Sequence, residues 1–168
     1  MSVAPCPLPA EALLTKYASG GGYTDCWAVD VPAAVTQAQF VEAFYTGTVF
    51  KLELALLGLL FAKPSTKADA RRLAAGELGA FSGWRVEAQT AEQLLMCDLG
   101  GGLTRSWLMA TPLTGPRSAT RLHFGSAVLA RVDKASGETR MSPLFAPLLG
   151  FHKLYSRVLL RGAEARLR

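Results

Sequence analysis

The chain has 168 residues, about the length of one domain, and its 50% hydrophobic and 18% charged residues are enough for a buried core and exclude a disordered chain. The longest uncharged apolar stretch, residues 54–62, is far shorter than the roughly 18 residues that a membrane-spanning helix needs, so we expect no transmembrane segment. The net charge of +5 is concentrated in residues 101–168, which carry 11 basic and 3 acidic side chains.

The first part of the chain predicts an arm, a strand and a helix. Residues 1–22 are rich in proline and glycine, and we interpret them as an N-terminal arm, or a short helix, with a flexible joint at Gly20–Gly22. Residues 23–31 alternate between two faces, which predicts a strand. Thr36 and Gln39 have the spacing of a capping box, so a helix is predicted to begin at Thr36, and Gly47 is predicted to end it.

A second helix is predicted over residues 49–62, and it is apolar on nearly every side. Such a helix is buried in the core, forms a partner or homodimer contact, or lies on a membrane surface. We favour the core and keep the other two interpretations as alternatives. A third helix is predicted to begin after Ser65 or Thr66 and to end at Gly76.

The hydrophobic period then changes from that of a helix to that of a strand. Four strands are predicted, over residues 84–89, 93–99, 103–111 and 120–131. Only short turns and loops separate them, which is typical of antiparallel strands joined in sequence order.

A long C-terminal helix is predicted after Ser142 and Pro143, a cap followed by a first-turn proline. One of its faces is predicted to pack on the sheet through Leu144, Leu148, Phe151, Tyr155 and Val158. The opposite face carries Lys153, Arg157 and Arg161. We expect the helix to fray near Gly162 and residues 163–168 to form a basic tail. A basic C-terminal part can bind phosphates or anionic lipid head groups, but a solvated helix face is the interpretation we favour.

This order of elements predicts an α+β fold for residues 23–162, a single domain with a curved antiparallel sheet. Helices follow the first strand, and the long C-terminal helix packs across the sheet. The order resembles that of the START-like (SRPBCC, helix-grip) superfamily, although fewer strands are predicted here than that superfamily usually has. The run from Leu95 to Leu108, together with Phe124–Ala127, also resembles a group of bacterial proteins of unassigned activity. The resemblance implies a cavity between the sheet and the C-terminal helix.

The cysteines indicate a reducing environment. There are three of them, Cys6, Cys26 and Cys97, and no two are close in sequence. This pattern argues against a disulfide framework and against a structural zinc site. The N-terminus lacks a basic segment followed by an apolar one, so we expect no secretory signal and a cytoplasmic location.

Seven side chains are candidates for lining the expected cavity: Trp27, Trp84, Arg105, Trp107, His123, Phe151 and Tyr155. The tryptophans have core packing as their alternative role. Arg105 binds an anionic ligand group or pairs across strands with Asp98 or Glu87.

The two histidines have different expected positions. The face of the strand that carries Leu122, Phe124 and Ser126 is the more apolar, so His123 is expected to point away from the core unless a bulge at Gly125 reverses the alternation. We expect His152 to be solvated at the edge of the polar face of the last helix.

We therefore expect a protein that binds an apolar or amphipathic small molecule, without a cofactor or metal ion and without nucleic acid. One alternative is an acid–base enzyme, such as a cyclase, dehydratase or isomerase, on the same scaffold. It would use His123, Asp98 or Tyr155, with Arg105 holding an anionic group of the substrate. The other alternative is an interaction module that dimerises through residues 49–62.

Overall fold

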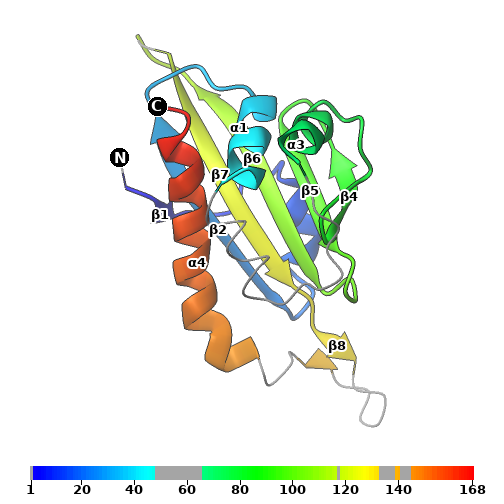
Figure 1. Cartoon of the computed structure of the whole chain (residues 1–168). Coiled ribbons are helices and arrows are strands. Elements are labelled where there is room, and N and C mark those ends of the chain that lie inside the picture. Colours follow the sequence, from blue (N-terminus) through cyan, green and yellow to red (C-terminus); the bar gives the residue numbers. More distant parts are fainter. Residues whose placement is uncertain (1, 48–65, 117, 133–138, 141–144) are drawn as a thin grey trace.

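The computed structural model describes residues 2–47, 66–116, 118–132, 139–140 and 145–168 (Figure 1). Its strands are β1 (Ala4–Pro5), β2 (Tyr23–Val31), β3 (Ala80–Phe81), β4 (Trp84–Gln89), β5 (Gln93–Asp98), β6 (Thr104–Leu113), β7 (Ala119–Val128), β8 (Arg131–Val132) and β9 (Thr139–Arg140). Its helices are the short 3-10 helix η1 (Leu13–Tyr17) and the α-helices α1 (Gln37–Tyr45), α3 (Lys67–Ala74) and α4 (Phe145–Ala165). The apolar helix predicted over residues 49–62 lies outside the described residues.

Seven strands form one open, curved antiparallel sheet in the order β1-β2-β7-β6-β5-β4-β3. The short strands β8 and β9 pair with each other. Figure 1 shows α4 lying along β2 and β7, and on the same face of the sheet α1 contacts β6 and α3 contacts β3. The predicted α+β class, with a curved antiparallel sheet and a packed C-terminal helix, is confirmed.

The long strands lie close to their predicted positions, but four short strands were not predicted. Strands β1, β3, β8 and β9 have two residues each, too few for an alternating pattern to be visible. Strand β6 also continues through Pro112, which we placed in a loop. The Ala110 amide donates to the carbonyl of Glu92, just before the first residue of β5. The nitrogen of Pro112, two residues later, faces the same side but lies beyond β5, so it needs no proton to donate there.

The helices α1 and α3 both begin with a capping box. The Thr36 hydroxyl accepts a hydrogen bond from the Gln39 amide at 3.2 Å, and the Gln39 side chain accepts one from the Thr36 amide at 2.8 Å. Thr66 and Asp69 exchange the same two bonds at the start of α3. The predicted cap of α1 is confirmed, and of the two candidate caps of α3 the structure selects Thr66.

The sheet is buried on both faces. The front face packs against α1, α3 and α4, and the central side chains of this front core are Val29, Phe40, Phe44, Leu108, Leu122, Phe124 and Leu160. The back face carries a second, smaller core that includes Ala12, Leu14, Cys26, Leu95, Trp107 and Met109. Trp107 is fully buried in this back core. Successive residues of the central strands therefore face the front core and the back core in turn, and they contact apolar side chains on either face.

The N-terminal segment that we interpreted as an arm covers the back face. Leu14, in η1, is completely buried there beside the ring of Trp107. Gly125 on β7 makes this close packing possible. A Cβ atom at Gly125 would lie 2.9 Å from each of three atoms, which belong to Asp25, Leu14 and Trp107. The strand registers run regularly through Gly125, so the bulge considered at this position is absent.

A bulge instead occurs in β4, at Glu87. Val86 pairs with Met96 and Ala88 pairs with Leu95, so Glu87 is the extra residue. Val86 packs against the front core and Ala88 against the back core, although the sequence pattern places both on one face. Glu87 and Ala88 therefore both lie on the back face, and the bulge reverses the alternation from Ala88 onward.

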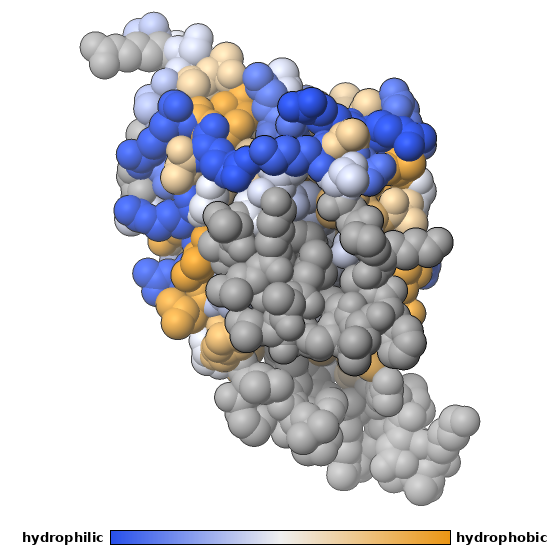
Figure 2. All heavy atoms as spheres, in the orientation of Figure 1, coloured by the Kyte–Doolittle hydropathy of each residue, from blue (hydrophilic) through white to orange (hydrophobic). Residues whose placement is uncertain are grey.

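Helix α4 packs through a different face than predicted. Phe151 is 62% exposed and Val158 is 42% exposed, whereas Ser156, Leu159 and Leu160 are buried. Leu144 lies outside the described residues, as does the side chain of Leu148. Apolar residues occur at almost every angle around residues 148–160, so their spacing does not select one face. Figure 2 shows apolar and hydrophilic side chains side by side on the surface along α4.

The C-terminal residues continue the helix instead of forming a tail. Helix α4 passes Gly162 and ends at Ala165, and both Ala163 and Glu164 are buried. The Arg166 guanidinium then donates to the Thr46 hydroxyl at the end of α1 at 3.0 Å. These contacts explain why the helix does not fray where we expected it to.

The packing around Gly125 generates a test of the back core. We expect Gly125→Ala to lower the free energy of unfolding by about 1–3 kcal/mol, because the added methyl group meets two side chains and a backbone carbonyl at 2.9 Å. Gly79→Ala is the matched control, since no atom lies within 4 Å of a Cβ there. Urea unfolding of both variants measures the difference. Equal stability of the two variants would contradict the close packing of η1 on the sheet.

Candidate functional site

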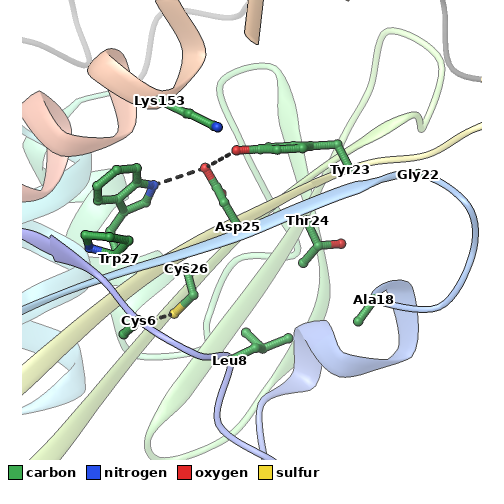
Figure 3. A pocket seen from close by; sticks show the side chains of 11 residues that line it. Cys6, Leu8, Ala18, Gly22, Tyr23, Thr24, Asp25, Cys26, Trp27 and Lys153 are labelled. Atoms are coloured by element: carbon green, nitrogen blue, oxygen red, sulfur yellow. Dashed lines mark hydrogen bonds between the residues drawn. The ribbon is translucent and has the colours of Figure 1, made fainter. Parts of the chain in front are cut away.

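A groove of about 690 Å³ lies at the edge of β2, between the N-terminal segment and α4 (Figure 3). It is lined by Pro5, Cys6, Leu8, Ala18, Gly22, Tyr23, Thr24, Asp25, Cys26, Trp27 and Lys153. Most of these residues belong to the first half of β2 or to the segment before it. Lys153 is the contribution of α4.

The groove exists because β1 is much shorter than β2. Strand β1 pairs only with Ala28 and Trp27, and the Cys6 amide adds one hydrogen bond to the Cys26 carbonyl at 3.0 Å. After Cys6 the chain leaves the edge, so the beginning of β2 has β7 on one side and the groove on the other. This part of the sheet is therefore an open edge.

Asp25 is the centre of the polar side of the groove. Its Oδ1 atom accepts hydrogen bonds from the amide and the hydroxyl of Ser126, at 3.1 and 2.6 Å. Its Oδ2 atom accepts from the Tyr23 hydroxyl and from the Trp27 indole, both at 3.0 Å. Four donors thus surround a carboxylate that is only 11% exposed, which offsets the cost of burying its charge.

His152 connects this cluster to α4. Its Nε2 atom lies 2.7 Å from the Ser126 hydroxyl oxygen. A carboxylate only accepts, so the Ser126 hydroxyl donates its proton to Asp25 and His152 must donate to Ser126. Burial lowers the pKa of His152 below its ordinary value of 6.5, against the opposing effect of the Asp25 charge, so the ring is neutral at pH 7.

Asp25, Ser126 and His152 are the residue types of a nucleophilic triad, but their order is different. In a triad the histidine stands between the serine and the carboxylate and takes the hydroxyl proton. Here Ser126 stands between Asp25 and His152, and its proton is directed at the carboxylate. These hydrogen bonds hold α4 against β2 and β7, and they do not activate the Ser126 hydroxyl for attack.

The cationic side of the groove comes from α4. Figure 3 shows the Lys153 amine pointing toward Tyr23 and Asp25. No carboxylate of the described residues lies within salt-bridge distance of that amine. One turn later, the guanidinium of Arg157 lies 5.8 Å from the centre of the Trp27 ring. The groove therefore combines an aromatic surface with positive charge above it.

A second polar cluster lies on the back face and contains Arg105. The Arg105 guanidinium contacts Glu87 at 2.5 Å and the Tyr17 hydroxyl at 3.1 Å, and it is 8% exposed. Lys16 also contacts Glu87 at 2.5 Å, and the Tyr17 hydroxyl donates to the same carboxylate. Of the two partners considered for Arg105, the structure selects Glu87. This network fixes η1 to the sheet.

Asp98 has a separate structural role at the turn between β5 and β6. Its carboxylate accepts hydrogen bonds from the amide and hydroxyl of Thr104, at 2.6 and 2.9 Å, and from the Gly102 amide at 3.2 Å. Although burial has the opposing effect, these hydrogen bonds outweigh it, and the pKa of Asp98 therefore lies below its ordinary value.

The seven candidate side chains do not surround one cavity. Three of them, Arg105, Trp107 and His123, lie on the back face, and Trp84 packs against the front core from β4 near the far edge of the sheet. His123 does point away from the front core, but the back core covers it and it is 6% exposed. Tyr155 is half-buried on α4 with the exposed Phe151 stacked on it. Only Trp27 lines the groove.

Sequence reasoning missed most residues of the groove. His152 is half-buried and bonded to Ser126, not solvated, because the packed face of α4 differs from the predicted one. Asp25 shares a strand face with Tyr23 and Trp27 at spacings of two residues, and this signal was visible in the sequence. The pairing of Asp25 with Ser126, 101 residues later, had no local signal.

Asp25→Asn tests the central carboxylate. We expect the free energy of unfolding to fall by about 1–3 kcal/mol, because an amide nitrogen replaces an acceptor oxygen and leaves buried donors unpaired. Asp30→Asn, on the same strand, is the control; it removes a surface pair with Arg121, which is worth only about 0–1 kcal/mol. Urea unfolding compares the two, and an equal or larger loss in Asp30→Asn would argue against this role of Asp25.

The Glu87 network predicts a dependence of stability on pH. Burial raises the pKa of Glu87, but hydrogen bonds from Lys16 and Tyr17 and the charge of Arg105 bring it below its ordinary value. The network therefore stabilises the fold above about pH 4.3, and this contribution is lost as the pH falls further. Glu87→Gln should cost about 1.5–3 kcal/mol at pH 7 and less at pH 3.

The control for this experiment is Glu92→Gln, because Glu92 is an exposed carboxylate in the turn between β4 and β5. Urea unfolding across pH 3–7 gives the free energy of unfolding of each variant. A cost of Glu87→Gln that stays constant over this range would contradict the network.

None of the described helices combines the length and the hydropathy that crossing a bilayer requires. Within the described part of the chain, no three histidine, cysteine or acidic side chains are grouped so as to hold a metal ion. Comparisons with protein-family models, curated proteins and solved structures gave no match. The groove is therefore the basis on which a function can be proposed.

Proposed function

We propose that the groove beside β2 binds an amphipathic small molecule that carries an anionic head group. The observation that carries this proposal is the composition of the groove. The Lys153 amine, which has no carboxylate partner among the described residues, lines a groove beside an open strand edge, and the Arg157 guanidinium lies over the indole ring of Trp27. Its volume of about 690 Å³ lies within the range of sites for small molecules, about 300–1,000 Å³.

The head group is assigned to the side of the groove formed by α4. The Lys153 amine is available to pair with a carboxylate, sulfate or phosphate group, and Arg157 adds a second positive charge one turn away. The Asp25 carboxylate does not compete for this role, since its two oxygens already accept four hydrogen bonds. A cationic ligand would therefore find no vacant acceptor at Asp25, and it would be repelled by Lys153.

The apolar part of the ligand is assigned to the other lining residues. The Trp27 ring, Leu8 and Pro5 supply carbon surface along the edge of β2, and Cys6 continues it. The open edge of β2 adds backbone groups that can orient a polar atom of the ligand. This division into a cationic end and an apolar wall favours an amphipathic ligand over a wholly apolar one.

The resemblance to the START-like superfamily supports the same type of function, because it implies a ligand site between the sheet and the C-terminal helix. The groove lies at that boundary, with β2 on one side and α4 on the other. The proposal uses Trp27 from the sequence-predicted candidates and adds Lys153, which the sequence placed on a solvated face.

The two alternative functions have less support. The acid–base alternative needs two or more of its groups in one pocket, and the structure places Asp98, His123 and Tyr155 at separate positions. The homodimer alternative uses residues 49–62, which lie outside the described residues.

Lys153→Glu tests the proposed head-group site. Titration calorimetry with decanoate should give a Kd at least about tenfold higher for this variant than for the wild-type chain, because the reversal removes an attraction and adds a repulsion. Lys67→Glu is the matched control, since Lys67 is an exposed lysine of α3 outside the groove, and its Kd should equal that of the wild type. Decylamine should bind more weakly than decanoate to the wild-type chain.

Higher ionic strength should also weaken decanoate binding to the wild-type chain, because salt screens a pair at an open groove. Decanoate that fails to bind the wild-type chain would reject the proposal. Equal losses in Lys153→Glu and Lys67→Glu would show that the net charge, and not the groove, controls binding.

A further inference from the structure

Two thiols face each other at the rim of the groove, on the opposite side of β2 from Asp25 (Figure 3). The Sγ atoms of Cys6 and Cys26 are 3.2 Å apart, and neither forms a disulfide. Strand β1 sets this position: Pro5 pairs with Trp27, so the register places the next residue, Cys6, opposite Cys26. The Cys6 amide also donates to the Cys26 carbonyl at 3.0 Å.

This geometry is close to that of a disulfide. Directly opposed residues of antiparallel strands have Cα atoms about 4.5–5.5 Å apart, within the range of about 4.4–6.8 Å for disulfides. A bond length of about 2.05 Å requires the sulfurs, now 3.2 Å apart, to approach by about 1.2 Å. Cys6 comes directly after the last residue of β1, and its amide makes the one backbone hydrogen bond to β2 beyond that strand. A small shift of the Cys6 backbone therefore disturbs few contacts.

The two thiols differ in access. Cys6 is half-buried and lines the groove, whereas Cys26 is 5% exposed in the back core. The hydrogen bond between the thiols lowers the pKa of Cys6, and the same bond together with burial raises the pKa of Cys26. Cys6 is thus the thiol that an external reagent reaches first, and Cys26 is positioned behind it.

We propose that Cys6 and Cys26 form a reversible dithiol–disulfide site that exchanges with small disulfides such as oxidised glutathione. The Cys6 thiolate attacks one sulfur of oxidised glutathione, the glutathione disulfide bond breaks, and one glutathione thiolate leaves and takes up a proton. Cys26 then loses its proton to water and attacks the Cys6 sulfur, which releases the second glutathione. Two protein thiols are oxidised, and one glutathione disulfide is reduced to two thiols.

The disulfide would connect the N-terminal segment to the sheet. The two cysteines are 20 residues apart, and the chain between them contains η1, which covers the back core. Oxidation therefore closes a loop around the covering segment and restricts its detachment from Trp107. Reduction leaves that segment held by the short strand β1, by the Glu87 network and by apolar contacts.

The test uses the full chain and oxidised glutathione. The wild-type protein should lose two of its three thiols, and peptide mapping should find Cys6 linked to Cys26 with Cys97 still free. The oxidised form should unfold at a temperature about 5–10 °C higher than the reduced form, and dithiothreitol should restore the original value.

Single substitutions separate a paired site from two independent thiols. Cys26→Ser should stop at a mixed disulfide of Cys6 with glutathione, because the resolving thiol is missing. Cys6→Ser should keep both remaining thiols, since Cys26 and Cys97 are buried. Cys97→Ser should still form the disulfide and is the control. The proposal is overturned if the wild-type chain keeps all three thiols, or if it accumulates the glutathione adduct of Cys6 without closing the disulfide.

Discussion

A sheet with apolar side chains on both faces must be covered on both sides, and this constraint organises the whole chain. Strands β2, β5, β6 and β7 place residues such as Leu108 and Phe124 on the front and Trp107 on the back. Among the described residues, helices α1, α3 and α4 cover the front, and the segment containing η1 covers the back (Figure 1). Because the back cover is short, its contacts must be close, and a glycine at position 125 permits the approach of Leu14 and Trp107.

Buried polar clusters attach each cover to the sheet. On the back, Glu87 and Arg105 bind Tyr17 of η1. On the front, Asp25 and Ser126 hold His152 of α4. These clusters give direction to contacts that apolar packing alone leaves unspecified, since hydrogen bonds require particular distances and angles. The groove of the proposed function lies where the front cluster meets the open edge of β2.

Local signals in the sequence predicted the elements, and long-range contacts decided the site. The capping box of Thr36 and Gln39 and the alternation of β2 depend on neighbours in sequence, so they were visible. The packed face of α4 was not visible in the sequence, because apolar residues occur all around the helix. The alternation of β4 was not visible either, because a single bulge at Glu87 reverses it. Asp25 and Ser126 come together only through the pairing of β2 with β7, and Cys6 meets Cys26 through a two-residue strand.

The pairing of β2 with β7 also has a consequence for how the protein acquires its structure. Asp25 and Ser126 are neighbours in the sheet but 101 residues apart in the chain, so the first long strand to be synthesised pairs only with the two residues of β1 until the last long strand emerges. Closing such a large loop costs entropy before any contact compensates for it, which slows folding. During translation β2 leaves the ribosome as an uncovered edge, and at that stage this nascent strand is open to aggregation and suited to a chaperone.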